Sequence, residues 1–346
     1  MCDVMSISHD SIRFYKAMIN GHGDDIYGYP DVRMNFSSNI CQHADHSRLK
    51  AHLMDRFDVV GNYPEPEACA LERALARRHQ VGENCVLVTG GATEAIYLIA
   101  HAYSQLPYYV VQPTFSEYDD ACRLFGLQRG RGGLTWVCNP NNPTGEVRRL
   151  ADYRPCEMLV VDQAYERYTR QPLLQPRDTV DDEHVILLHS MTKDYAVPGL
   201  RLGYVTAAPA VIARLRRYLH PWSVNALAIE AGLFLLAHDE LLMTPDLEEA
   251  QRLYRRLRAL DGVAVFPTDT NFMLCRAGHL TAAELKDRLA RHHGMLIRDA
   301  SNFQGLDVHH FRIAAQLPSE NDALVEALEN ILHSSSRQKH RPFVKC

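Results

Sequence analysis

The sequence predicts an α/β protein with a second, smaller α+β lobe. Short apolar runs alternate with helical patterns between residues 85 and 206, which is typical of a layered sheet with helices on its faces. Beyond about residue 240 the pattern changes to a long charged helix that precedes further strands and helices. A length of 346 residues leaves room for two domains.

Periodicity, and the residues that interrupt it, give the elements of the larger part. Apolar runs predict strands at 85–89, 108–112, 134–138, 157–161, 185–188 and 202–206. Helical patterns predict helices at 66–80, 92–103 and 116–125. The pair Gly90-Gly91 separates the first strand from the helix that follows it.

The smaller lobe is expected to contain helices at 246–260, 281–292 and 319–333, with strands at 263–266, 272–276 and 310–313. We therefore divide the chain into an N-terminal arm (1–45), a large domain (46–240), a small C-terminal domain (241–335) and a loose polar tail (336–346).

Composition and charge argue against several classes of protein. The net charge of −5 gives no long-range attraction to nucleic acid, and no apolar run is long enough to span a membrane. The N-terminal residues lack the apolar core of a signal peptide. The nine Cys form no CxxC pair, and the His residues lack clustered Cys or carboxylates, so we expect no disulfide framework and no metal. We expect a cytoplasmic protein.

Lys193 lies in the most informative segment, HSMTKDYAVPGLRLGY. A predicted buried strand leads into Ser190, Thr192 and Lys193, and Arg201 follows after a Pro-Gly break. A lysine that forms an imine with an aldehyde requires a fixed position and a lowered pKa, and an arginine with nearby hydroxyls suits a dianionic phosphate. A lone lysine here would more often be an ordinary surface residue. Together these groups suggest pyridoxal 5′-phosphate (PLP), which carries both an aldehyde and a phosphate.

Two further segments supply groups that PLP chemistry requires. Asp162 ends an apolar strand, where a buried carboxylate needs a partner such as a protonated pyridine nitrogen. Tyr165 and Asn142 can donate hydrogen bonds to the 3′-oxygen of the same ring. Each residue is weak evidence alone, but the order NNPTG, DxAY, SxTK and RxGY is very specific.

This order of motifs resembles the fold-type I PLP-dependent enzymes of the class I/II aminotransferase superfamily, over about residues 20 to 335. The segments HGDD, NFSSNI, PWSVNALA and IRDASNFQGLD lean toward L-threonine-O-3-phosphate decarboxylase, in the branch that also contains histidinol-phosphate aminotransferase. The resemblance implies a three-layer large domain with a mainly parallel sheet, a small α+β domain, and a Schiff base between PLP and Lys193.

The cofactor side of the site is largely implied by this resemblance. Gly91, Ala92 and Thr93 lie between a strand and a helix, and a helix N-terminus binds phosphate well. The family places its phosphate loop there and stacks an aromatic residue, here Phe115, on the pyridine face. Tyr63 matches a tyrosine that reaches the PLP phosphate of the neighbouring subunit, which implies a homodimer with shared active sites.

The substrate side rests on two arginines. The resemblance makes Arg312, in FRIAAQ, the bidentate clamp on the substrate carboxylate. Arg298, in LIRDASNF, is the expected partner of a second substrate anion, a phosphate. His22 and Asn39, from the arm, match positions that line the same pocket, although a structural role is equally open for both.

Two activities stay open, and decarboxylation of a phosphorylated amino acid, as in cobalamin synthesis, is the one we expect. The alternative is transamination, with histidinol phosphate the first substrate to test. Both would use Lys193 and Asp162, and they differ in which bond at the substrate Cα breaks. A non-catalytic PLP-fold module would predict the loss of Lys193, Asp162 or an arginine, and none is lost.

The chain also departs from most relatives. Gln163 stands where many have Glu, and the connections between residues 125 and 139 and between 147 and 158 are short. These short connections predict that a strand–helix excursion is missing and that the large domain is trimmed on one side.

Overall fold

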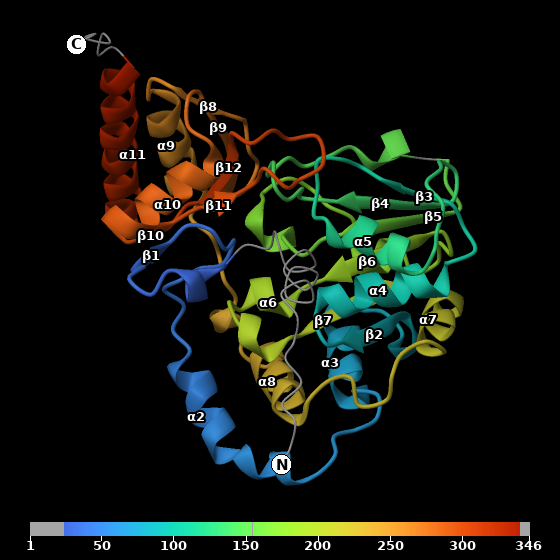
Figure 1. The fold of residues 1–346 in the computed structure, drawn as a ribbon. Helices are drawn as coiled ribbons and strands as arrows, with labels where there is room; N and C mark the ends of the chain where they lie inside the picture. The colour runs from blue at the N-terminus through green and yellow to red at the C-terminus, as the bar shows by residue number, and fades with distance from the viewer. Residues whose placement is uncertain (1–23, 154, 340–346) are drawn as a thin grey trace, which may run out of the picture.

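The computed structural model of the protein describes residues 24–153 and 155–339. Figure 1 shows a large domain that carries a mixed sheet and, beside it, a small domain near the C-terminal end of the chain. The arm passes between them.

Six strands form the sheet of the large domain, in the order β2-β7-β6-β5-β4-β3. They are β2 (Val86–Thr89), β3 (Tyr108–Val110), β4 (Leu134–Cys138), β5 (Met158–Asp162), β6 (Val185–His189) and β7 (Gly203–Ala207). The pairs from β3 to β6 are parallel, and β7 runs antiparallel to both β6 and β2. All residues of β4 to β7 are buried, as expected for strands covered on both faces. The predicted fold class is confirmed.

Helices and loops cover the two faces of this sheet. One face packs against α4 (Ala92–Ala102), α5 (Glu117–Leu124) and α7 (Pro209–Arg216). On the other face, α3 (Cys69–His79) and α8 (Ala226–Leu236) pack over β2 and β7. Over the rest of that face, Leu150 from a short 3-10 helix and Leu174 from a loop pack against strand residues such as Val137 and Val161.

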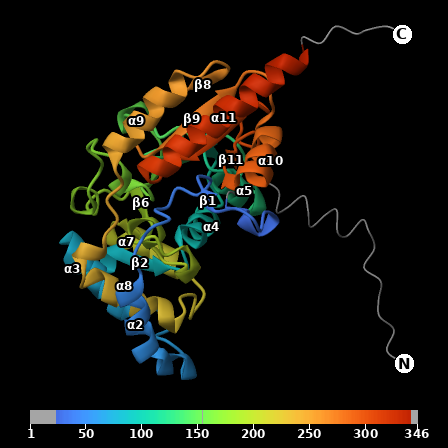
Figure 2. The same ribbon diagram turned by 90° about the vertical axis from the view of Figure 1, so that its left-hand side faces the viewer.

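The small domain has a four-stranded antiparallel sheet in the order β11-β12-β9-β8. Its strands are β8 (Val263–Val265), β9 (Phe272–Ala277), β11 (Arg298–Asp299) and β12 (His310–Ala314). Three helices cover one face of this sheet (Figure 2): α9 (Leu247–Arg258), α10 (Ala282–His293) and α11 (Pro318–Lys339). Helix α11 continues past residue 336, where the sequence predicts the start of a loose tail.

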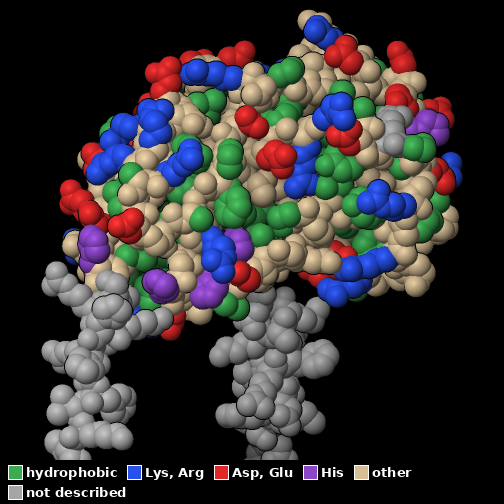
Figure 3. All heavy atoms as spheres, turned by 90° about the horizontal axis from the view of Figure 1, so that it is seen from above, with side chains coloured by type: hydrophobic (Ala, Val, Ile, Leu, Met, Phe, Trp, Pro, Cys, Tyr) green, Lys and Arg blue, Asp and Glu red, His purple; other side chains and the backbone are tan. Residues whose placement is uncertain are grey.

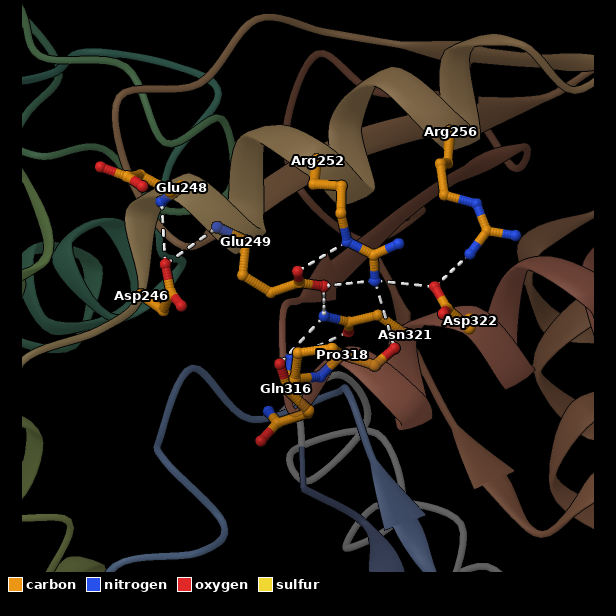
Figure 4. Close-up of polar contacts among 9 residues, drawn as sticks. All are labelled: Asp246, Glu248, Glu249, Arg252, Arg256, Gln316, Pro318, Asn321 and Asp322. Atoms are coloured by element: carbon orange, nitrogen blue, oxygen red, sulfur yellow. Dashed lines mark hydrogen bonds and ion pairs between the residues drawn. The ribbon is translucent and has the colours of Figure 1, made fainter.

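Polar contacts join α9 to the start of α11 (Figure 4). Asn321 is fully buried and donates to Glu249 at 2.7 Å and to the carbonyl oxygen of Gln316 at 2.9 Å. Arg252 donates to both carboxylate oxygens of Glu249, at 2.7 and 2.8 Å, and pairs with Asp322 at 2.7 Å. This network holds the residues that directly follow β12.

The arm links the two domains. Strand β1 (Met34–Asn35) pairs in parallel with β10 (Met295–Leu296), and the amide of Ala314 donates to the carbonyl oxygen of Phe36 at 2.9 Å. The chain then enters α2 (Ser47–Asp55), whose Leu49 joins the core formed by α3 and α8. Residues 34–36 are therefore held by the small domain and α2 by the large one.

Several elements were not predicted, and each has a physical reason. Helix α8 has the sequence ALAIEAGLFLL, which is apolar on most sides and so lacks the helical stripe that periodicity detects. Strands β1, β10 and β11 contain two residues each, too few to give an alternating pattern. Helices α2 and α7 were also not predicted, because with nine and eight residues they are too short for a distinctive helical period.

The structure next to β3, at the edge of the large sheet, is consistent with the prediction that a strand–helix excursion is missing. Residues 125–133, between α5 and β4, contain no further strand of the sheet. A single isolated β-bridge pairs Arg129 with Tyr108. The amide of Tyr108 donates to the carbonyl oxygen of Gln128 at 2.9 Å, and the carbonyl oxygen of Tyr108 accepts from the amide of Gly130 at 2.9 Å. The connection therefore replaces a strand with one bridge.

Among the helices of the described residues, none combines the length and the apolar character needed to cross a bilayer. On the face seen in Figure 3, Lys and Arg side chains are interspersed with Asp and Glu side chains.

Candidate active site

A cavity of about 330 Å³ lies where the carboxyl ends of β4, β5 and β6 meet the small domain and the arm. This is the edge at which open α/β sheets bind ligands. The cavity brings together most of the site residues predicted from the sequence: Asn39, Ala92, Thr93, Phe115, Asn142, Asp162, Tyr165, Ser190, Thr192, Lys193, Arg201, Arg298 and Arg312.

Lys193 lies in the short helix α6 (Met191–Asp194), which begins directly after β6. Protein groups surround its amine, and burial together with the nearby cations Arg312 and Arg201 lowers its pKa to about 7, against the opposing effect of Asp24 and Asp162. A large share of the amine is therefore neutral near pH 7, which is the form that acts as a nucleophile.

Asp162 is the last residue of β5 and is 5% exposed. Burial raises the pKa of this carboxyl, and hydrogen bonds from Tyr118 and from the amide of Ala164 oppose the rise. Those bonds measure 2.7 Å from Tyr118 Oη to Oδ2 and 2.8 Å from Ala164 N to Oδ1. Asp162 also borders the cavity, so it can accept a further hydrogen bond from a protonated ring nitrogen.

Two glycines allow Arg201 to approach the N-terminus of α4. Gly91 has a φ of +95°, and a Cβ there would lie 2.6 Å from Nη2 of Arg201. A Cβ on Gly203 would lie 2.4 Å from the amide nitrogen of Ala92. Because both positions lack a side chain, the guanidinium of Arg201 reaches the N-terminus of α4, where free N–H groups favour an anion.

Arg312 reaches the cavity because of strand alternation. Its neighbours Phe311 and Ile313 join the core beneath the small-domain helices, so Arg312 points to the opposite face. The guanidinium donates to Oδ1 of Asn142 and to the carbonyl oxygen of Ser37, both neutral groups. Its Nε has no partner among the described residues although the side chain is buried.

Arg298 stands directly opposite Arg312 in the β11–β12 pair. Burial and the charge of Arg312 lower the pKa of Arg298 to about 10, and its Nη2 donates to Oδ1 of Asn302 at 2.9 Å. Like charges that face each other across a strand pair are destabilising. The pair is therefore suited to an anion that lies between or beside the two guanidinium groups.

Asn142 and Tyr165 complete the cofactor side. Since Oδ1 of Asn142 accepts from Arg312, its amide nitrogen is left as a donor. Burial raises the pKa of Tyr165 to about 12, so its hydroxyl remains a donor at neutral pH. The Tyr165 ring also lies 5.5 Å from Nζ of Lys193.

Asn39 is 1% exposed and borders the cavity. Within the described part of the chain, neither Nδ2 nor Oδ1 of its amide has a hydrogen-bond partner. A buried amide without partners costs free energy, so a bound ligand would relieve this cost.

The cavity of this chain does not include Tyr63, which is 84% exposed and lies 5.3 Å from the ring of Trp222. His22 lies outside the described residues. Sequence reasoning missed Tyr118, which carries no motif signal, and Asp24 and Ser37, which lie within the quoted segments HGDD and NFSSNI but were given no role.

The donor set fits PLP. A buried amine, a carboxylate at the floor, two donors for a ring oxygen and a cradle that a Cβ would fill line one cavity. Across residues 24–153 and 155–339 no group of three or more His, Cys, Asp or Glu side chains is arranged to hold a metal ion.

Comparison with known proteins identifies the family of the chain. The family model for aminotransferase class I and II matches residues 31–133 and 128–328. A threonine-phosphate decarboxylase of Salmonella typhimurium is 32% identical over 88% of this chain and 92% of its own length. A histidinol-phosphate aminotransferase of Symbiobacterium thermophilum is 32% identical over 79% of this chain and 83% of its own length.

Solved structures give the same result. The crystal structure of L-threonine-O-3-phosphate decarboxylase from Porphyromonas gingivalis superposes with a TM-score of 0.82 at 36% identity, over 87% of this chain and all of that one. A histidinol-phosphate aminotransferase from Sinorhizobium meliloti, solved with PLP, shares the fold with a TM-score of 0.73 at 20% identity, over 88% of this chain and 91% of that one. The chain belongs to the class I and II aminotransferase family of PLP-dependent enzymes.

Proposed function

We propose that this enzyme decarboxylates a phosphorylated amino acid, and that L-threonine O-3-phosphate is its substrate. The observation that carries the proposal is the facing pair Arg298 and Arg312 at the cavity. A phosphorylated amino acid brings two anionic groups, one for each of these guanidinium groups. The similarity to two threonine-phosphate decarboxylases over most of the chain supports the same substrate.

Each residue has a role in this proposal. When bound, PLP supplies an electron sink for the carbanion that forms at the substrate Cα. Asp162 holds the proton on the ring nitrogen, and Arg312 binds the substrate carboxylate. Arg298 binds the phosphate. Lys193 delivers a proton to Cα after CO₂ has left, for which a pKa of about 7 is well matched to neutral pH.

Product analysis tests this assignment. The PLP-loaded enzyme is incubated with L-threonine O-3-phosphate, without any keto acid. We expect CO₂ and aminopropanol phosphate in equal amounts, and no product with the Lys193→Ala variant. A keto product that appears only when a keto acid is added would contradict decarboxylation.

A second candidate is transamination of histidinol phosphate, which the 32% identity to a histidinol-phosphate aminotransferase supports. It would use the same Lys193 and Asp162, with the phosphate again at Arg298. Histidinol phosphate with 2-oxoglutarate is therefore the parallel assay, and glutamate formation measures it.

We also propose that two copies of the chain form a dimer in which Tyr63 of each serves the other cavity. Trp222, whose ring centroid lies 5.3 Å from that of Tyr63, is 48% exposed, and Met54 and Phe57, which precede Tyr63 in the chain, are 69% and 58% exposed. Sedimentation should give a dimer. The Tyr63→Phe variant should stay dimeric and bind PLP more weakly, and a fully active monomer would contradict the proposal.

A further inference from the structure

Tyr118, on α5, forms the floor of the cavity together with Asp162. It is 1% exposed, and its hydroxyl donates to Oδ2 of Asp162 at 2.7 Å. The other donor to this carboxylate within the described residues is the amide of Ala164, at 2.8 Å from Oδ1. Within the described residues, Tyr118 is thus the side chain that donates a hydrogen bond to this carboxylate.

The Tyr118 ring is fixed independently of its hydroxyl. It stacks on Trp136 with ring centroids 5.3 Å apart and an interplanar angle of 20°. It also meets Phe115 edge-to-face at 5.9 Å and 83°. Removal of the hydroxyl alone should therefore leave both the ring packing and the position of Phe115 unchanged.

We propose that Tyr118 is a positioning residue for PLP, whose hydroxyl keeps Asp162 ionised so that the proton between Asp162 and the ring nitrogen stays on the nitrogen. Burial disfavours the charged carboxylate, and a hydrogen bond to the charged form favours it. Without the Tyr118 donor, Asp162 becomes the stronger base and takes a larger share of that proton. The ring nitrogen would then lose the charge that makes it an electron acceptor.

The test uses the Tyr118→Phe variant loaded with PLP that carries ¹⁵N at the ring nitrogen. We expect the ¹⁵N chemical shift to move toward the value of an unprotonated pyridine, and the Kd for PLP to rise about tenfold, as for the loss of one hydrogen bond to a charged group. The matched control is Tyr108→Phe, which removes another Tyr-to-Asp hydrogen bond, 2.7 Å from Oη to Oδ1 of Asp119 on the same helix. The control should change neither quantity.

A double variant separates this role from general packing. In an Asp162→Asn background the Tyr118→Phe change should no longer alter the Kd for PLP, because the carboxylate it acts on is absent. Incorporation of 3-fluorotyrosine at position 118, a stronger donor, should move the ¹⁵N shift in the direction opposite to Tyr118→Phe. An unchanged ¹⁵N shift in both variants, or an equal loss of PLP affinity in the Asp162→Asn background, would overturn the proposal.

Discussion

The two sides of the cavity handle charge differently. The cofactor floor, formed by Asp162, Asn142, Tyr165 and Lys193, meets its buried carboxylate with donors from the protein itself. The substrate wall, formed by Arg298 and Arg312, places two buried cations opposite each other. Arg312 donates to an amide and a carbonyl oxygen rather than to a carboxylate.

The difference indicates what each side is built to receive. In the proposed function, a cationic ring nitrogen completes the floor, where the protein already holds the carboxylate of Asp162 in place. On the wall, neutral oxygens orient a cation without neutralising it, so the compensating charge has to come from the ligand. The buried cation of Arg312 is costly without a compensating charge, and in the proposed function this cost favours an anionic substrate.

The largest effect is expected from a substitution in the cofactor floor. The Asp162→Asn variant keeps the shape of the side chain, so it should fold and take up PLP. Its kcat should fall by several orders of magnitude, because a neutral amide does not hold the ring nitrogen protonated. Steady-state kinetics and the visible absorbance of the loaded protein measure this. Near-wild-type kcat would mean that another group holds the nitrogen.

The next largest effect is expected from a substitution in the substrate wall. Arg298→Ala should reduce the preference for a phosphorylated over an unphosphorylated substrate by about 10–100-fold, the value of a charged hydrogen bond, while PLP binding stays intact. The matched control is Arg276→Ala on β9, which loses an ion pair with Asp307 at 2.9 Å at the protein surface. Competition assays between threonine and threonine phosphate give the ratio. If Arg298→Ala leaves the ratio unchanged, the phosphate is bound elsewhere.

A third experiment measures the pKa of the Lys193 amine, which belongs to the cofactor floor, by titration. The Lys193 amine has a pKa lowered to about 7, so it is protonated below that pH and free above it. In the protein stripped of PLP, acylation of Lys193 by a small reagent should rise with pH and reach half its limit near pH 7. Ordinary lysines titrate near 10.4. Peptide mass spectrometry follows the modification, and a midpoint above pH 9 would contradict the lowered pKa.

The floor was more predictable from sequence than the wall, for a physical reason. Asp162 ends one strand of the large sheet, and Asn142 and Lys193 follow two others, so the carboxyl ends of these strands bring the three residues to one edge. The strand that carries Arg312 was predicted, but the role of Arg312 was implied only by the family resemblance. The strand that places Arg298 opposite it was missed, because β11 is two residues long and leaves no alternating pattern. Tyr118 was missed because its partner, Asp162, lies 44 residues away along the chain.

The smallest effect concerns the support of the wall rather than its charges. Asn321 joins α11 to Glu249 and to both backbone groups of Gln316, just beyond the strand that carries Arg312. Asn321→Ala removes this partner from the amide and carbonyl groups of Gln316 and takes one of three donors from Glu249, which keeps its bonds from Arg252. The change should lower the free energy of unfolding by about 1–3 kcal/mol. Arg256→Ala, which removes a half-exposed pair with Asp322 in the same network (Figure 4), should cost about 0–1 kcal/mol. Urea unfolding measures both, and neither variant should change the Kd for PLP, because the floor does not depend on this network. An equal cost for the two would show that burial of Asn321 contributes nothing to the small domain.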